Sequence, residues 1–174
     1  MKRTIAGAIL VLASALAGCG FHLRPPASLP AAMQRTYISD KENDVQLVRE
    51  LSRYLTTPTT SVTRDAAKAT AILYILKSRR YERVLSVSNT GQPLVNQVAY
   101  VVNFSLATHS GETLIPTQRL ILTRQYNYNT ANMVGNTEQS NILYKAMVQD
   151  MVQLILFRLE ALTHKPSAQT TSTQ

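Results

Sequence analysis

Three long β-forming segments, separated by two short turns, fill the middle of the sequence. The segments span residues 71–88, 95–108 and 113–128, and they are rich in Val, Ile, Leu, Tyr and Phe. Residues 89–93 (Asn-Thr-Gly-Gln-Pro) and 109–112 (His-Ser-Gly-Glu) supply the turns. Because connections this short join antiparallel neighbours, the pattern predicts an antiparallel meander. The strands exceed the usual length of about 5–6 residues, so they are expected to project beyond whatever covers them.

Two helices flank the meander in the sequence. Residues 43–56 carry apolar side chains at helical spacing, with Asn43 as a possible N-cap and Pro58 after the end. A short strand at 35–39 precedes this helix, and a polar connection at 59–68 follows it. After a polar loop at 129–136 and the stretch Thr137-Glu138-Gln139-Ser140, a long helix is expected that runs to about residue 164 and is ended by Pro166. Its apolar stripe consists of Tyr144, Val148, Met151, Val152, Ile155, Leu159 and Leu162.

The N-terminal residues resemble a bacterial lipoprotein signal. Lys2 and Arg3 precede an apolar run, which ends in Leu-Ala-Gly before Cys19, the only cysteine. We expect residues 1–18 to be cleaved and Cys19 to carry acyl chains that anchor the protein in a membrane. Gly20 fits release to the outer membrane, whereas Asp there would favour retention in the inner membrane. The alternative is an ordinary secretory signal with a chance cysteine beside the cut.

Cleavage after residue 18 would leave 156 of the 174 residues in one domain without a disulfide. Residues 19–34, with three prolines, are expected to form an extended lipidated leader. The domain is expected to span 35–166, followed by a disordered polar tail at 167–174. The mature chain would have 16 basic and 10 acidic residues, a net charge of +6. This charge indicates an anionic partner such as a lipid head group, and nucleic acid is a poor candidate outside the cytoplasm.

No pattern in the sequence indicates catalysis, a metal or a cofactor. His22, His109 and His164 lie far apart, and there is no Gly-x-Ser-x-Gly motif or glycine-rich phosphate loop. The one cluster of carboxylates, around Asp44, precedes a helix, where negative charge favours the helix dipole. We therefore expect a protein that is not an enzyme and has no cofactor.

Basic residues gather on the first long strand. Lys77, Arg79 and Arg83 occupy alternate positions, so they are expected to line one face with Tyr81 between them. Arg80 lies in the same stretch, and Arg119 and Arg124 lie on the third long segment. Such a row can pair with the phosphates of an amphipathic anion while acyl chains lie on neighbouring apolar residues. The alternative is a solvated strand face whose charges discourage edge pairing.

The opening Cys19-Gly20-Phe21-His22-Leu23-Arg24 resembles that of the LptE (RlpB) family of lipopolysaccharide-assembly lipoproteins. The order strand, helix, three long strands, long helix and polar tail is also similar to this family, as are Glu138-Gln139 and Lys145-x-Met147. The resemblance implies an α+β fold in which two helices pack on one face of a four-stranded, mostly antiparallel sheet. It further implies an outer-membrane lipoprotein that plugs and helps assemble the LptD β-barrel, and that binds lipopolysaccharide during its insertion into the outer leaflet.

The resemblance also bears on individual residues. Lys145 lies where relatives have a helix lysine, which implies a contact with lipopolysaccharide. The turn at 88–92 has no basic residue here, although some relatives have one, and we expect Arg79, Arg80 and Arg83 to substitute for it. One alternative function is a periplasm-facing lipoprotein that binds an anionic lipid or glycan without a barrel partner. A lipid-anchored hydrolase is a third, against which the isolated histidines and scattered carboxylates argue.

Overall fold

The computed structural model describes residues 29–162, so Cys19, the signal sequence, most of the leader and the predicted tail lie outside the described residues. Within this range the chain forms two 3₁₀ turns, five strands and two α-helices. In chain order they are η1 (Ala31–Met33), β1 (Arg35–Asp40), α2 (Val45–Leu55), β2 (Ser61–Thr63), η2 (Ala66–Lys68), β3 (Ala71–Val87), β4 (Pro93–Thr108), β5 (Thr113–Asn127) and α3 (Met133–Glu160).

The strands form one mixed sheet in the order β2-β1-β3-β4-β5. β3, β4 and β5 form the antiparallel meander that the turns predicted. β1 runs parallel to both β2 and β3. The sheet therefore has five strands rather than the four expected, because the polar connection at 59–68 contains β2. Three residues are too few to show an alternating pattern, so β2 depends on its backbone pairing with β1.

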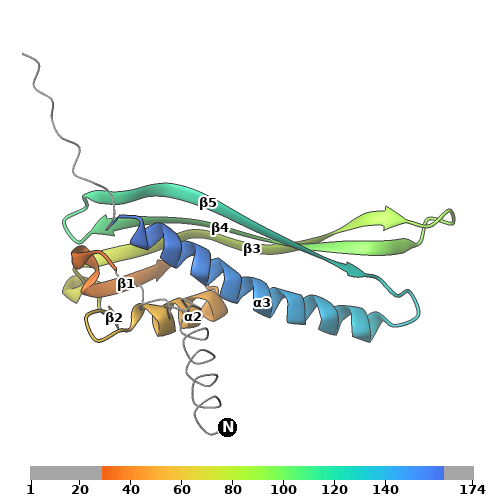
Figure 1. Ribbon diagram of the computed structural model, residues 1–174, viewed down its shortest axis with the longest axis horizontal. Coiled ribbons are helices and arrows are strands. Elements are labelled where there is room, and N and C mark those ends of the chain that lie inside the picture. The colour runs from red at the N-terminus through yellow and green to blue at the C-terminus, as the bar shows by residue number, and fades with distance from the viewer. Residues whose placement is uncertain (1–28, 163–174) are drawn as a thin grey trace, which may run out of the picture.

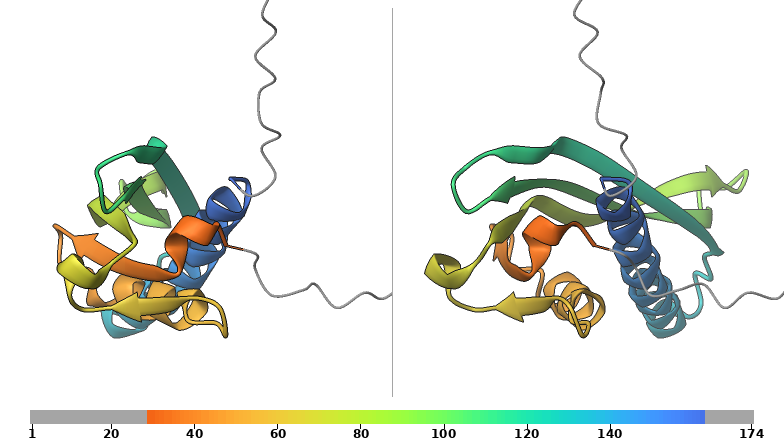
Figure 2. Two further views of the ribbon diagram at one scale, coloured as in Figure 1. Left: turned by 90° about the vertical axis from the view of Figure 1, so that its left-hand side faces the viewer. Right: turned by 60° about the vertical axis from the view of Figure 1, so that its left-hand side comes forward.

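The molecule has two layers, with α2 and α3 on the same side of the sheet (Figure 1, Figure 2). This arrangement confirms the predicted α+β class with both helices on one face. Within residues 29–162, no helix covers the other side, which we call the open face. The β3–β4 hairpin projects beyond the end of β5 (Figure 1). Because β1 pairs only with Ala71–Ile75, the rest of β3 forms an edge of the sheet.

The core lies between the sheet and the two helices. The predicted alternation in β4 is confirmed, since Val98, Tyr100, Val102, Phe104 and Leu106 are all fully buried. Opposite them lie Leu47, Leu51 and Leu55 of α2 and most of the predicted stripe of α3. At about 25 cal/mol per Å² of apolar surface removed from water, these side chains supply most of the free energy that favours folding.

Both helices begin at a side-chain cap. Asp44, rather than the predicted Asn43, caps α2, and its Oδ1 accepts a hydrogen bond from the Leu47 amide (3.0 Å). Asn43 instead adopts a left-handed conformation with φ of 57°, which Asn tolerates better than most residues. α3 begins earlier than predicted, at Met133 rather than after Ser140, because Asn132 Oδ1 accepts from the Gly135 amide (2.8 Å). The loop expected at 129–136 therefore contributes the first turn of the helix.

A β-bulge divides β3 into two parts with opposite alternation. Ile75 pairs with Phe104 and Lys77 with Asn103, so Leu76 is an extra residue without a partner on β4. Before the bulge, Ala71, Leu73 and Ile75 face the core. After it, the even-numbered residues from Ser78 to Glu82 face the helices, and the odd-numbered residues face outward. The bulge thus moves the core-facing positions of β3 from odd to even numbers, so that Arg80 and Glu82 point into the protein.

Candidate functional site

The open face carries a group of basic side chains on its two outer strands. Residues that pair across strands share a face, so the register places Arg79, Val101 and Ile121 in one row. The next row towards the hairpin contains Tyr81, Ala99 and Thr123. The two flanking rows are Lys77–Asn103–Arg119 and Arg83–Gln97–Gln125. These four rows contain four cations and no carboxylate.

The middle of β4, the central strand of this face, is apolar. Ala99 and Val101 are only 2% exposed, although no described helix covers them. Their neighbours Tyr81 and Ile121 are about half exposed, at 47% and 50%. An apolar strip bordered by cations has the two features that an amphiphilic anion requires of a binding surface.

The structure confirms that Lys77, Arg79 and Arg83 lie on one face with Tyr81 between them. Arg79 forms an ion pair with Glu42 (Nη2 to Oε2, 3.5 Å), and both side chains are partly exposed. Arg83 Nε donates a hydrogen bond to Gln97 Oε1 (2.8 Å). An exposed ion pair contributes only about 0–1 kcal/mol, so a multiply charged ligand can replace Glu42 at little cost.

Arg80 lies on the opposite side of β3 and contacts α3. Its guanidinium donates to Asn141 Oδ1 (2.9 Å), Glu82 Oε1 (2.9 Å) and Ser140 Oγ, and it lies over the ring of Tyr144 (5.0 Å to the centroid). Glu82 also accepts hydrogen bonds from Ser140 and from Tyr126 (3.1 Å). Burial opposes the charge on Glu82, but these donors outweigh it and hold the pKa of its carboxyl below the ordinary value. The contacts of Arg80 and Glu82 with α3 therefore link the β3–β4 hairpin to the first half of this helix.

A second polar group surrounds Asp44. Its Oδ2 accepts hydrogen bonds from the hydroxyls of Ser78, Tyr100 (2.8 Å) and Tyr144 (3.3 Å). Burial, together with the nearby carboxylate, raises the pKa of Tyr144 to about 12 and that of Tyr100 further. Both tyrosines thus keep their protons and remain donors to Asp44. This group joins the start of α2 to the sheet and α3, which supports the structural interpretation of the acidic cluster.

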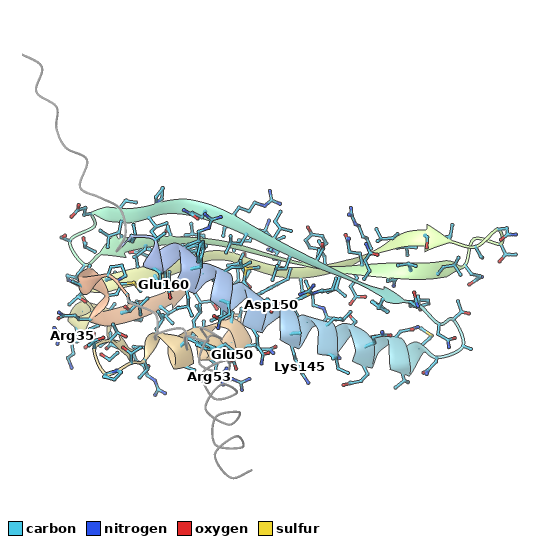
Figure 3. All side chains as sticks on the ribbon, viewed as in Figure 1. Arg35, Glu50, Arg53, Lys145, Asp150 and Glu160 are labelled. Carbon is cyan, nitrogen blue, oxygen red and sulfur yellow. The ribbon has the colours of Figure 1, made fainter. Side chains whose placement is uncertain are left out.

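The remaining predicted site residues lie apart from the open face. Lys145 is exposed on α3, on the side turned away from the sheet (Figure 3). Arg124 faces α3, where it pairs with Asp150 (2.7 Å). Cys19 lies outside the described residues. Of the predicted lipopolysaccharide-binding residues, the structure brings together Arg79 and Arg83, and it separates them from Arg80 and Lys145. The pairing of Lys77 and Arg119 through Asn103 was missed, because register across three strands is not visible in the sequence.

The tip of the β3–β4 hairpin forms a second exposed surface. Residues 84–96 contain no charged side chain. Val84, Leu85, Val87 and Leu94 are 40–55% exposed. An exposed apolar group on a projecting hairpin is typical of a contact surface for another molecule.

A groove of about 790 Å³ lies between α2 and the β1–β2 edge. Tyr37, Val48, Arg49, Val62 and Arg64 are among the residues that line it. Its lining mixes apolar and charged side chains, and it includes none of the predicted site residues.

Residues 29–162 carry neither a candidate metal site nor a candidate membrane-spanning helix. This part of the chain contains no group of three or more His, Cys, Asp or Glu side chains placed to hold a metal ion. In the same residues, neither helix combines the length and the apolar character needed to cross a bilayer.

Comparison with known proteins agrees with the fold. The model of the family described as "LptE: Lipopolysaccharide-assembly" matches residues 33–159. A relative from Photorhabdus laumondii, named "LPS-assembly lipoprotein LptE", is 26% identical over 112 residues. That match covers 64% of this chain and 62% of the relative, so it spans less than two thirds of the relative's length.

Solved structures of lipoproteins share the fold. An uncharacterized lipoprotein B from Nitrosomonas europaea is 30% identical, with a TM-score of 0.70 and coverage of 84% of this chain and 94% of that one. A minor lipoprotein from Acinetobacter baumannii has a TM-score of 0.63 at 20% identity, and covers 76% and 94% of the two chains. Since the family model matches most of the sequence, the chain belongs to the LptE family of lipopolysaccharide-assembly proteins.

Proposed function

We propose that this protein is a non-catalytic lipoprotein subunit of the machinery that inserts lipopolysaccharide into the outer membrane. In this role it plugs and helps assemble an LptD-like β-barrel, and it binds lipopolysaccharide as the lipid passes to the outer leaflet. The observation that carries the proposal is the family match over residues 33–159. The open basic face, with Ala99 and Val101 at its apolar centre, adds a surface suited to a phosphorylated amphiphile.

The anchor of this subunit is the acylated Cys19. Leu29, the first described residue, lies ten positions after it, and ten residue steps of fully extended chain span at most about 35 Å. The domain therefore stays close to the inner leaflet of the outer membrane. Mass spectrometry of the membrane-extracted protein should show cleavage before Cys19 and added acyl chains, and Cys19→Ser should abolish both. An uncleaved or unacylated wild-type chain would contradict the anchor.

The barrel contact is supported by the hairpin. Its projecting, uncharged tip can enter a partner without burying an unpaired charge, which would be costly. The surrounding polar and basic surface suits the polar lumen of an outer-membrane barrel. Isolation of the tagged full-length protein from its own outer membrane in mild detergent should recover a large β-barrel in near-equal amount. An unrelated tagged outer-membrane lipoprotein, expressed at the same level, is the matched control.

The same isolation experiment distinguishes the barrel plug from the alternative function, a lipoprotein that works without a barrel partner. Recovery of the protein alone, or with lipid only, would contradict the plug and favour a lipoprotein that binds an anionic lipid or glycan by itself. Lipopolysaccharide binding through Arg79 and Arg83 is supported by their position on the open face. Binding through Arg80 and Lys145 stays a prediction, and charge reversal at each of the four residues tests it in a direct binding assay.

A further inference from the structure

The row Lys77–Asn103–Arg119 at one end of the open face has the chemistry of an anion site. We propose that these three side chains bind a phosphate group on the sugar head of an amphiphile. The inference rests on the proposed binding of lipopolysaccharide and gives it a specific location. It involves none of the four residues that the sequence selected for this role.

The sheet brings the three side chains together. Asn103 of β4 pairs with Lys77 of β3 on one side and with Arg119 of β5 on the other. Neighbouring strands lie about 4.8 Å apart, so the two outer backbones are separated by about 10 Å. Lysine and arginine side chains reach across half of this distance, so both charged groups can meet above Asn103. One phosphate can then accept hydrogen bonds from both cations.

Both cations are available to a ligand. Lys77 and Arg119 are exposed, and within the described part of the chain neither has an ion pair or a side-chain hydrogen bond. Arg79 and Arg83, by contrast, already contact Glu42 and Gln97. The row therefore offers two uncompensated positive charges, one on each side of Asn103.

Asn103 adds a polar group that lacks a partner. Its Oδ1 is buried and accepts no hydrogen bond from residues 29–162. A buried acceptor without a donor is unfavourable, and such groups in folded proteins usually have a specific reason. Rotation of the amide about the Cβ–Cγ bond turns either Oδ1 or Nδ2 towards the surface. A phosphorylated sugar can pair with whichever atom faces outward: its phosphate oxygens accept from Nδ2, and its hydroxyls donate to Oδ1.

The neighbouring rows favour an amphiphile over a free phosphosugar. Val101 and Ile121 lie one row away from Asn103, and Ala99 lies one row further towards the hairpin tip. An acyl chain attached to the sugar can lie along this apolar strip while the phosphate stays on Lys77 and Arg119. The site thus predicts an orientation for the lipid, with the acyl chain directed towards the hairpin.

The test compares two double variants that remove the same charge. Lys77→Gln/Arg119→Gln removes the proposed site, and Arg53→Gln/Lys68→Gln, which changes two exposed cations on α2 and η2 that have no proposed role in binding, is the matched control. Binding of the full-length protein in detergent is measured for purified lipopolysaccharide and for the same material after enzymatic removal of its lipid phosphates. The first variant should bind intact lipopolysaccharide at least about tenfold more weakly than wild type, and the control within about threefold. For wild type, dephosphorylation should cause a similar loss, whereas the first variant should respond little to it.

A third variant separates binding from folding. Asn103→Leu removes the unpaired amide at similar volume, so the urea midpoint should stay constant or rise while affinity for intact lipopolysaccharide falls. Equal affinities for the two double variants, or an unchanged affinity for Asn103→Leu, would overturn the proposed site and leave lipopolysaccharide binding elsewhere intact. Failure of wild type to bind lipopolysaccharide would overturn the binding function itself, and the site with it.

Discussion

Replacing Asp44 with alanine should destabilise the protein more than any other loss of a carboxylate in the described chain, because this side chain has two structural roles. Its Oδ1 caps α2, and losing an N-cap costs about 0.5–2 kcal/mol. Its Oδ2 accepts from Ser78, Tyr100 and Tyr144, and the Tyr100 side chain is fully buried. Depriving that hydroxyl of its acceptor costs about 1–3 kcal/mol. Part of this free-energy cost is recovered because the hydroxyls of Tyr100 and Ser78 can still form a hydrogen bond with each other (3.0 Å).

The expected loss for Asp44→Ala is therefore about 2–4 kcal/mol, measured as the free energy of unfolding of the full-length protein in urea. The matched control is Asp150→Ala, which breaks a half-exposed pair with Arg124 and should cost no more than about 1 kcal/mol. A double-mutant cycle with Tyr100→Phe should show a coupling of about 1 kcal/mol, since the two side chains form a direct hydrogen bond. Equal losses for Asp44→Ala and the control, or fully additive effects in the cycle, would refute this account of the Asp44 group.

Two further predictions concern Glu82 and the core. The pKa of Glu82 is lowered from 4.5 in the folded protein, so its stabilising effect is complete above about pH 4.5 and is lost as the pH falls through the folded pKa. The difference in urea midpoint between wild type and Glu82→Gln should thus be largest near neutral pH and shrink in acid, and a constant difference would contradict the charge effect. In the core, Leu73→Ala should cost about 2–5 kcal/mol, because Leu73 is fully buried. The same change at Leu85, 40% exposed at the hairpin tip, should cost less than about 1 kcal/mol, and equal urea midpoints would be inconsistent with the packing described.

The elements with strong periodicity were predictable from the sequence. The alternation through Val98 and Tyr100, and the helical spacing through Val148 and Ile155, reflect burial of one side of each element. Repetition over many residues gives such a pattern enough weight to be detected. β2 has only three residues and no such pattern, and the start of α3 depends on a single cap at Asn132. These short features are determined by individual backbone and side-chain contacts.

The candidate site was predictable only in part, for the same reason. Alternation along one strand placed Lys77, Arg79 and Arg83 on a common face, which the structure confirms. It gave no information about partners on other strands, so the row through Asn103 to Arg119 was missed. It also did not show that Arg80 is held by Ser140 and Asn141 of α3. Local periodicity specifies a face, whereas a site requires the register between segments distant in the sequence.

The bulge at Leu76 gives β3 one place where a change in chain length can be tolerated. Ile75 and Lys77 pair with adjacent residues of β4, so loss of Leu76 would close the ladder without changing its register. Lys77 and Arg79 would stay on the open face, and Arg80 and Glu82 would stay directed towards α3. Homologues that lack this residue are thus expected to keep the same order of charged and apolar positions in the rest of the strand. When sequences of this family are aligned, a gap at this position leaves the face of every following residue up to the turn unchanged.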